Sequence, residues 1–268
     1  MKITVLKLGG ELIETPADLA HTAGAIVTLA ASLQADGGAL AIVHGGGRAI
    51  DAALAERGIT PRKQDGIRLT DAATLAVVVD VLAGRANTTL VAALNAHGVR
   101  AVGLTGADAG LGLSARVESM AADGGATVDP GLVGQPVSTA QTALIGDLAR
   151  HGYVPVIASI GADAAGALLN VNADVMAAHV AAATGAASLL LAGGTAGVLD
   201  ASGATLPELD EAMLDAIVAD GTATAGMVAK LNAARAALTA GVPDVRIVSG
   251  RDGLFSRGTS LRPHALAT

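Results

Sequence analysis

The sequence predicts an α/β fold in which helices cover both faces of a mainly parallel sheet, giving three αβα layers. Short apolar runs of strand character alternate with longer segments of helical periodicity along most of the chain. This alternation is typical of parallel strands joined by crossover helices. Two glycine-rich turns follow directly after two of the apolar runs. Because ligands of open α/β sheets bind beyond the carboxyl ends of the strands, these turns also mark a candidate site.

Six apolar runs are predicted as strands, and three longer segments as helices. The strands are 3–8, 39–43, 101–104, 154–160, 188–191 and 245–248. The helices are 17–35, 74–97 and 139–151, and their apolar residues recur on one face. Residues 175–199 carry no charge and are long enough to cross a bilayer of ~30 Å, but four glycines interrupt them. We therefore interpret that stretch as a helix followed by a strand.

Two segments interrupt the alternation of strands and helices. Residues 58–71 contain a proline, a charged cluster and Asp65-Gly66, which together predict a β-hairpin. Residues 118–135 are rich in glycine and aspartate, as a solvent-side hairpin or loop would be. Both are candidate lids. A soft boundary at 161–166 divides the chain into two predicted lobes, 1–165 and 166–268, with one cleft between them.

Composition narrows the class of protein and of partner. The 268 residues include no cysteine, which excludes disulfides, thiolate nucleophiles and cysteine-ligated metals. The six histidines form no His-x-His or His-x-x-x-His pair, so we expect no resident metal. A net charge of −7, no basic run and 1% aromatic residues argue against nucleic-acid binding. The start of the chain has no signal-peptide pattern, so we expect a cytoplasmic protein with no membrane contact and a small-molecule partner.

The two glycine-rich turns indicate a site for anions. Lys7 ends the first predicted strand and precedes Gly9-Gly10, so its ammonium lies beside backbone N–H groups that face the crevice. A cation beside such a turn is what phosphoryl transfer requires, since that chemistry depends on positioning and charge stabilisation. Taken alone, Lys7 also fits a solvated lysine at a strand end. In the second turn, 44–47, three successive glycines predict close approach of a ligand, with His44 as a packed histidine.

Three further places carry candidate site residues. Arg68 emerges from the predicted hairpin, where a guanidinium can hold a carboxylate or can simply face solvent. Asn170, Asn172 and Asp174 alternate along an extended segment before an alanine-rich helix, and helix capping is the competing interpretation. Lys230 enters another amphipathic helix, where most lysines are surface residues.

Taken together, these motifs resemble the acetylglutamate kinases, a family within the amino-acid kinase superfamily. The match runs nearly end to end, in order and in spacing. The motifs are Lys-Leu-Gly-Gly at 7–10, Val-His-Gly-Gly-Gly at 43–47, Gly-Ile-Arg-Leu-Thr at 66–70, Ala-Gly-Arg-Ala-Asn at 83–87, Ala-Val-Gly-Leu-Thr-Gly at 101–106, Asn-Val-Asn-Ala-Asp at 170–174, Gly-Met-Val-Ala-Lys at 226–230 and Gly-Thr-Ser-Leu at 258–261. With no added N-terminal helix in the sequence, the chain resembles the short, homodimeric, arginine-insensitive members.

The resemblance implies a carbamate kinase-like fold with two lobes and transfer of the ATP γ-phosphoryl group to the side-chain carboxylate of N-acetyl-L-glutamate. It implies that Lys7 and Lys230 stabilise the transferring group and that Asp174 holds both lysines. The implied substrate-binding residues are Gly10, Gly45, Gly46, Arg68, Asn170 and Asn172. The implied ATP-binding residues are Gly9, Gly193, Gly194, Thr195, Gly197, Thr222, Thr224, Gly226 and Met227. Mg²⁺ would arrive with ATP, held largely by phosphates and water. The first lobe would bind the amino acid and form the dimer, and the second would bind the nucleotide.

One signature of the resembled family is missing. The family has Ser or Thr followed by Asp after the strand that begins the nucleotide lobe, whereas residues 190–200 read Leu-Leu-Ala-Gly-Gly-Thr-Ala-Gly-Val-Leu-Asp. The acid falls at Gly193 or Gly194, and neither has a side chain. Three alternatives follow: an active enzyme with a modified nucleotide contact, a related kinase for a carrier-linked aminoadipate or glutamate, or a ligand-binding regulatory homologue without turnover. The retention of Lys7, Asp174 and Lys230 favours the first.

Overall fold

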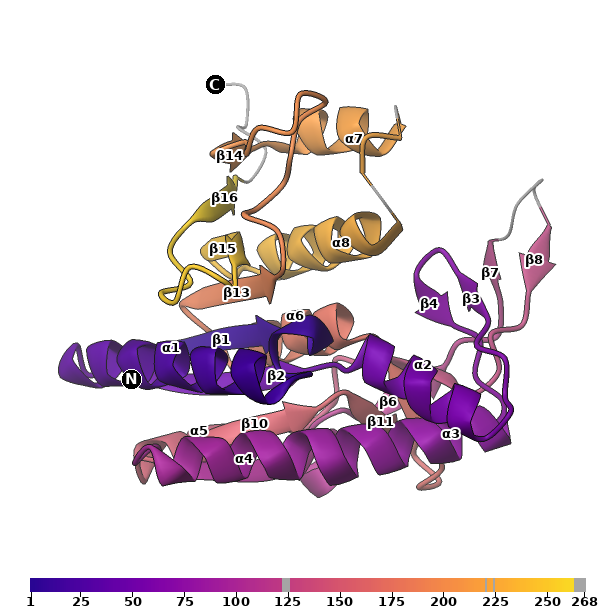
Figure 1. The fold of residues 1–268 in the computed structure, drawn as a ribbon, viewed down its shortest axis with the longest axis horizontal. Helices are drawn as coiled ribbons and strands as arrows, with labels where there is room; N and C mark the ends of the chain where they lie inside the picture. The colour runs from indigo at the N-terminus through magenta and orange to yellow at the C-terminus, as the bar shows by residue number, and fades with distance from the viewer. Residues whose placement is uncertain (122–125, 220, 224, 263–268) are drawn as a thin grey trace.

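The computed structural model describes residues 1–121, 126–219, 221–223 and 225–262. Its centre is an eight-stranded sheet with the order β14-β16-β15-β13-β1-β2-β10-β5 (Figure 1). The only antiparallel pair in this sheet, within the described residues, is β15 with β16. Its strands are β1 (Ile3–Leu8), β2 (Ala39–His44), β5 (Ala101–Thr105), β10 (Val154–Ala158), β13 (Ser188–Gly193), β14 (Glu208–Leu209), β15 (Asp244–Ser249) and β16 (Gly258–Leu261).

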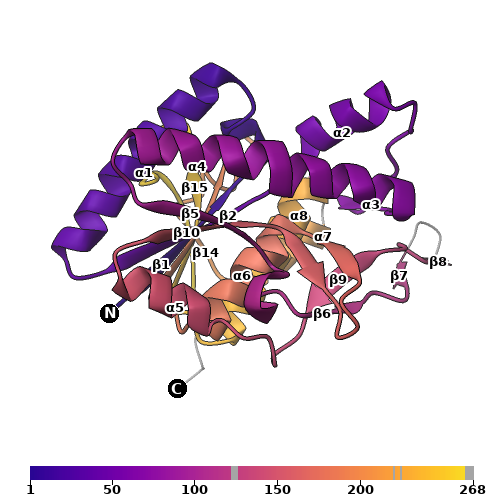
Figure 2. The ribbon, with the colours of Figure 1, turned by 90° about the horizontal axis from the view of Figure 1, so that it is seen from below.

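Helices cover both faces of this sheet, as predicted. Along β1, Ile3 and Val5 pack into one core cluster with α5, α6 and α8, whereas Leu6 and Leu8 pack into another with α1 and α4. Figure 2 shows α1 and α4 on one side of the strands and α5 and α6 on the other. The helices are α1 (Pro16–Ala35), α2 (Gly47–Glu56), α3 (Ala72–Val79), α4 (Asn87–Ala96), α5 (Ala143–Arg150), α6 (Ala173–Ala183), α7 (Glu211–Ala219) and α8 (Ala225–Thr239). The alternation of strand side chains between two apolar layers confirms the three-layer α/β fold.

Short 3₁₀ turns, a second sheet and two hairpins complete the fold. The 3₁₀ turns are η1 (Gly10–Leu12) and η3 (Asp108–Gly110). The four strands of the second sheet are β6 (Ser114–Arg116), β9 (Val133–Pro136), β11 (Ile160–Ala162) and β12 (Leu168–Val171). The hairpins are β3 (Lys63–Gln64) with β4 (Ile67–Arg68), and β7 (Met120–Ala121) with β8 (Thr127–Val128). The bases of the two hairpins are joined because Thr70 donates its backbone N–H to the Pro130 carbonyl at 2.8 Å. Figure 1 shows the two hairpins side by side.

Most of the predicted elements are found with bounds that differ by at most two residues, and two predictions need a larger correction. The predicted strand 154–160 is wrong, because it breaks at Ser159: β10 belongs to the large sheet and β11 to the small one. The predicted helix 139–151 starts only at Ala143, because the N–H of Gln141 is bonded to the Gly110 carbonyl at 3.2 Å. The hairpin at 58–71 is confirmed, with positive φ at Asp65 (49°) and Gly66 (79°), as a two-residue turn requires. Residues 122–125 of the second predicted hairpin lie outside the described residues.

The longest helical run, Ala72–Ala96, joins α3 to α4 through a π-helical segment, η2 (Asp80–Ala86). Among the described residues it is the one helix that is long and apolar enough to cross a membrane by length and composition, with a mean hydropathy of 1.5. Its Leu90 and Leu94 are fully buried against the sheet, and Figure 2 shows α4 lying across the strands. We therefore assign this run to the outer layer of the fold. The stretch 175–199 is the predicted helix and strand, α6 and β13.

His44 is a packed histidine, as predicted, and Asn87 is its partner. Asn87 donates one amide hydrogen to His44 Nε2 at 3.0 Å and the other to the Val156 carbonyl at 2.9 Å. Burial lowers the pKa of His44 to about 4, so the ring is neutral and Nε2 accepts. A Cβ at Gly103 would lie 2.2 Å from the Asn87 Oδ1 atom, so glycine is required beside it. This cluster joins α4 to three neighbouring strands just behind the glycine turn 44–47.

Asn87→Ala should lower the free energy of unfolding by about 2–4 kcal/mol, because it leaves His44 Nε2 buried without a donor and removes a buried hydrogen bond to the Val156 carbonyl. Urea denaturation monitored by circular dichroism measures this. The matched control is Asn232→Ala, since Asn232 is exposed on α8 and should change stability by less than about 0.5 kcal/mol. Equal effects of the two variants would contradict the structural role given to Asn87.

Candidate active site

The two glycine turns meet backbone to backbone at the carboxyl ends of β1 and β2. Gly45 donates its N–H to the Leu8 carbonyl at 3.3 Å, and Gly9 donates to the Ala192 carbonyl at 3.1 Å. A Cβ at Gly10 would lie only 2.7 Å from the Cα of Gly46. Any side chain at Gly10 would therefore push the turns apart. The sequence of each turn is explained by this contact as much as by an incoming ligand.

Asp174 joins two lysines from distant parts of the chain. Its Oδ1 lies 3.0 Å from Lys7 Nζ and 3.3 Å from Lys230 Nζ. Lys7 comes from the end of β1, Asp174 from the first turn of α6, and Lys230 from α8. All three side chains are buried. The structure thus brings together the three residues predicted to be catalytic.

The charges in this triad determine its protonation. Burial alone would raise the pKa of the Asp174 carboxyl, but the two lysines hold it below its usual value, so it is ionised. Burial pushes the pKa of Lys7 down, and the Asp174 carboxylate more than offsets this, so the pKa is raised. Burial and then the positive charge of Lys7 lower the pKa of Lys230 to about 8. At neutral pH the triad is two ammonium groups on one carboxylate, with a net positive charge available to an anion.

A cavity of about 250 Å³ opens beside the triad, and all six predicted substrate-binding residues line it. Its lining includes glycines of both turns, Arg68 and Asn170. Asp51 on α2 holds the buried Arg68 guanidinium at 2.6 Å, and Arg68 Nη2 donates to the Gly47 carbonyl at 3.1 Å. Asn170 donates its amide to the Thr70 hydroxyl at 3.0 Å. A fixed guanidinium, an amide and the ammonium group of Lys7 in one cavity suit a small molecule with two anionic groups.

Asn172 lines the same cavity, and its side chain caps a helix. Its Oδ1 accepts N–H bonds from Asp174 at 2.8 Å and from Val175 at 3.3 Å, which makes it the N-cap of α6. The helix-capping interpretation of this residue is therefore present in the structure. The cap fixes the first turn of α6, and with it the position of Asp174. A Cβ at Gly45 would lie 3.1 Å from the Ala173 Cβ, so the start of α6 packs against the second glycine turn.

Of the residues predicted to bind ATP, Gly9 lines this cavity, and the other described ones lie at or after the end of β13 or shortly before Lys230. Gly193 ends β13, and Gly194 and Thr195 follow it. Gly226 and Met227 lie in the first turn of α8, upstream of Lys230. Gly197 has a φ of 121° and packs against β16, where a Cβ would lie 2.7 Å from the Thr259 Oγ1. Thr222 precedes α8, and Thr224 lies outside the described residues.

Sequence reasoning missed two acids. Asp51 fixes Arg68, and Glu11, directly after Gly9-Gly10, accepts the N–H of Gly194 at 3.0 Å through its Oε1. The signal for Glu11 was its place immediately after the first glycine pair. No pattern in the sequence marks Asp51, because its contact depends on how α2 lies against the β3–β4 hairpin. Within the described part of the chain, no group of three or more His, Cys, Asp or Glu side chains is placed to hold a metal ion.

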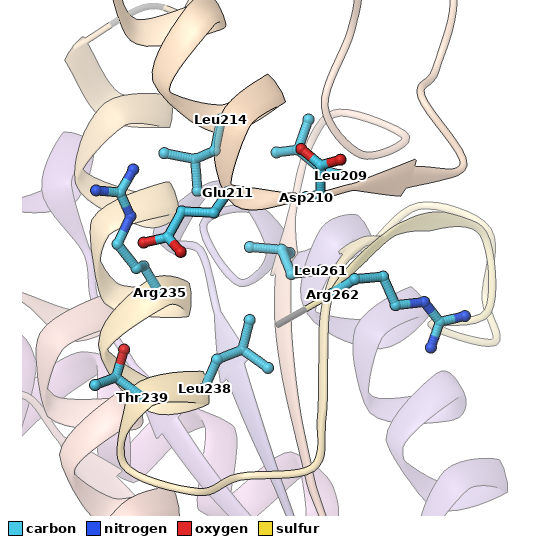
Figure 3. A pocket seen from close by; sticks show the side chains of 9 residues that line it. All are labelled: Leu209, Asp210, Glu211, Leu214, Arg235, Leu238, Thr239, Leu261 and Arg262. Carbon is cyan, nitrogen blue, oxygen red and sulfur yellow. The ribbon is translucent and has the colours of Figure 1, made fainter. Parts of the chain in front are cut away.

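A second, smaller cavity of about 110 Å³ lies where α7 and α8 meet β14 and β16. Figure 3 shows its leucine side chains converging, with Glu211 and Arg235 at one edge and Arg262 at the other. It contains none of the predicted site residues and no lysine.

Comparisons with known sequences point to one family. The model of the amino acid kinase family matches residues 2–249. The chain is 41% identical over 251 residues to a protein named acetylglutamate kinase from Sphingopyxis alaskensis, covering 92% of this chain and 82% of that protein. A protein of the same name from Koribacter versatilis is 41% identical over 248 residues, covering 92% of this chain and 90% of that one.

Comparisons with solved structures agree on the fold. A crystal structure of a protein from Streptococcus mutans UA159 matches with a TM-score of 0.80 and 28% identity, covering 97% of this chain and 98% of that one. The carbamate kinase from Giardia lamblia bound to AMP-PNP matches with a TM-score of 0.63 and 15% identity, covering 98% of both chains. At that identity the likeness concerns the fold alone.

Asp174→Asn should lower the pKa of Lys230 below its value of about 8, because it removes the anion shared by two neighbouring ammonium groups. Titration of ε-¹³C-labelled lysine by NMR measures this in the ligand-free protein. Asp51→Asn is the control, since Asp51 pairs with Arg68 and Lys63 instead. An unchanged Lys230 titration in Asp174→Asn would contradict the proposed charge sharing.

Proposed function

Because the chain belongs to the amino acid kinase family, we propose that it transfers the γ-phosphoryl group of ATP to the side-chain carboxylate of N-acetyl-L-glutamate. The product is N-acetyl-L-glutamyl 5-phosphate, and the reaction is a step of arginine biosynthesis. The relatives named acetylglutamate kinase, about 40% identical over most of the chain, support this substrate. The observation that carries the mechanism is that two lysines share Asp174 where the glycine turns meet.

The reaction needs charge stabilisation rather than a base. The γ-carboxyl of the substrate has an unperturbed pKa of about 4.3, so it is already an anion at neutral pH. One of its oxygens attacks the γ-phosphorus, the bond from that phosphorus to the bridging oxygen breaks, and ADP leaves. The main obstacle is repulsion between a carboxylate and a polyphosphate. Lys7, Lys230 and the N–H groups of the glycine turns oppose it, and Asp174 keeps both ammonium groups on the transfer path.

We propose that the acceptor, N-acetyl-L-glutamate, binds in the cavity beside the triad. We assign Arg68 to the α-carboxylate, with Asp51 fixing its guanidinium. Asn170 and Asn172 take the N-acetyl end. The backbone of Gly10, Gly45 and Gly46 faces the γ-carboxylate and the phosphoryl group.

The nucleotide would bind on the other side of Lys230. Its proposed contacts are Gly9, Gly193, Gly194, Thr195, Gly197, Thr222, Thr224, Gly226 and Met227. Mg²⁺ would come with ATP as the substrate complex, held mainly by phosphate oxygens and water. We propose that the lobes divide at 165/166, in the turn between β11 and β12. The first lobe, 1–165, would bind the acceptor and form the homodimer contact. The second lobe, 166–268, would bind the nucleotide. We also propose that the enzyme is cytoplasmic.

Neither alternative function is favoured. The relatives carry the name of the acetylglutamate enzyme rather than of a kinase for a carrier-linked amino acid. A regulatory protein without turnover has no need of two buried lysines on one carboxylate, since burying charge is costly unless it is paired. The triad is instead suited to a reaction that brings two anions together, the acceptor carboxylate and the phosphoryl group of ATP.

Lys230→Ala should lower kcat by about 10²–10³-fold and change the KM for N-acetylglutamate by less than about threefold, since the lost charge acts on the transferring group. ADP release coupled to N-acetylglutamate measures both constants. Lys2→Ala, at an exposed position, is the control and should behave as wild type. Absence of turnover in the wild-type protein, with N-acetylglutamate binding intact by calorimetry, would overturn the proposed function.

A further inference from the structure

Glu11 links the first glycine turn to the turn that follows β13. It lies in η1, immediately after Gly9-Gly10, and its Oε1 accepts the N–H of Gly194 at 3.0 Å. These residues are 183 positions apart in the sequence. The bond therefore ties the phosphoryl-path turn to the turn on the nucleotide side. No other role in the proposed reaction has been given to this side chain.

The Glu11 carboxylate fills space that three glycines leave open. A Cβ at Gly9 would lie 2.4 Å from both of its oxygens. A Cβ at Gly193 would lie 3.4 Å from Oε1, and one at Gly194 would lie 3.8 Å from it. Gly193 and Gly194 themselves have no side chain. The Glu11 carboxylate therefore lies over the turn after β13, although Glu11 and Gly194 are 183 positions apart in the sequence.

The same carboxylate balances the charge of the triad. The charged groups that face Lys230 are Lys7 from β1, Asp174 from α6 and Glu11 from η1. Lys7 and Asp174 alone leave Lys230 as an uncompensated buried cation. Glu11 acts on both lysines in the direction that favours their charged forms. With Glu11 the group contains two cations and two anions.

We propose that Glu11 is a positioning residue: it keeps Lys230 protonated for phosphoryl transfer and fixes the Gly193-Gly194 turn toward the nucleotide. This inference rests on the proposed kinase function. It also explains how two buried lysines share one aspartate, because Glu11 places a second carboxylate beside them.

Glu11→Gln separates the charge from the hydrogen bond, because the amide oxygen still accepts the Gly194 N–H. In the ligand-free protein, the Lys230 titration midpoint should fall from about 8 by about one pH unit. It is followed by NMR with ε-¹³C-lysine, and the Lys230 signal is assigned with Lys230→Arg. The basic limb of the pH profile of kcat/KM for MgATP should move down by the same amount, while the plateau at lower pH stays within about twofold of wild type.

Two variants make the test specific. Glu14→Gln removes an acid from the same segment that pairs with Arg48 instead, so it should leave both midpoints at their wild-type values. Glu11→Gln combined with Gly194→Asp should return them toward wild type, because it restores a carboxylate at the turn. The added Cβ has ordinary contacts of 3.6 Å to Glu11 Cγ and 3.7 Å to Arg251 Nε. A purely structural Glu11 would not be rescued in this way.

The two proposals fail in different ways. An unchanged Lys230 titration in Glu11→Gln, or a double variant that stays as impaired as the single one, would overturn the role of Glu11 whether or not the protein is a kinase. A wild-type protein without turnover in which the Lys230 midpoint still shifts would overturn the kinase function and leave the charge role of Glu11 standing.

Discussion

The ion pairs of Asp174 with Lys7 and Lys230 are the interaction on which the rest of the structure depends. Two ammonium groups cannot lie side by side in a buried site unless an anion is placed between them. Asp174 supplies it from the first turn of α6, and Asn172 fixes that turn by capping the helix. The sheet order places β1 next to β13, and α8 packs beside α6. This order brings residue 7 and residue 230 together.

Glycine at the strand ends follows from the same constraint. In the proposed reaction the phosphoryl path runs where β1, β2 and β13 end, and the chain must turn there without side chains between the lysines and their ligand. Gly10 and Gly46 approach each other through their backbones, and both line the cavity. Because glycine has no side chain, neighbouring residues supply the charged groups. Glu11 supplies it on the nucleotide side, and Asp51 supports Arg68 on the acceptor side.

The sequence was sufficient for much of the fold because apolar periodicity is local. The apolar runs of β1 and β13 and the Asp65-Gly66 turn each consist of neighbouring residues, and each was found as predicted. The small sheet was missed because its strands have only three or four residues, and its central pair, β12 with β9, joins Asn170 to Val133 from distant parts of the sequence. The break at Ser159 could not be predicted either, since residues 154–160 are apolar throughout apart from Ser159 itself.

The site divides in the same way. Lys7, Asp174 and Lys230 were found through motifs, while Asp51 acts through a contact that no local pattern shows. The central claim is that the paired lysines bind the transferring phosphoryl group more tightly than they bind either substrate. Calorimetry with MgADP, aluminium fluoride and N-acetylglutamate measures this directly, comparing wild type with Lys7→Met. The account predicts that Lys7→Met loses at least about 100-fold in affinity for the aluminium fluoride complex while binding MgADP alone within about threefold of wild type. Equal losses for both ligands, or none for the complex, would contradict it.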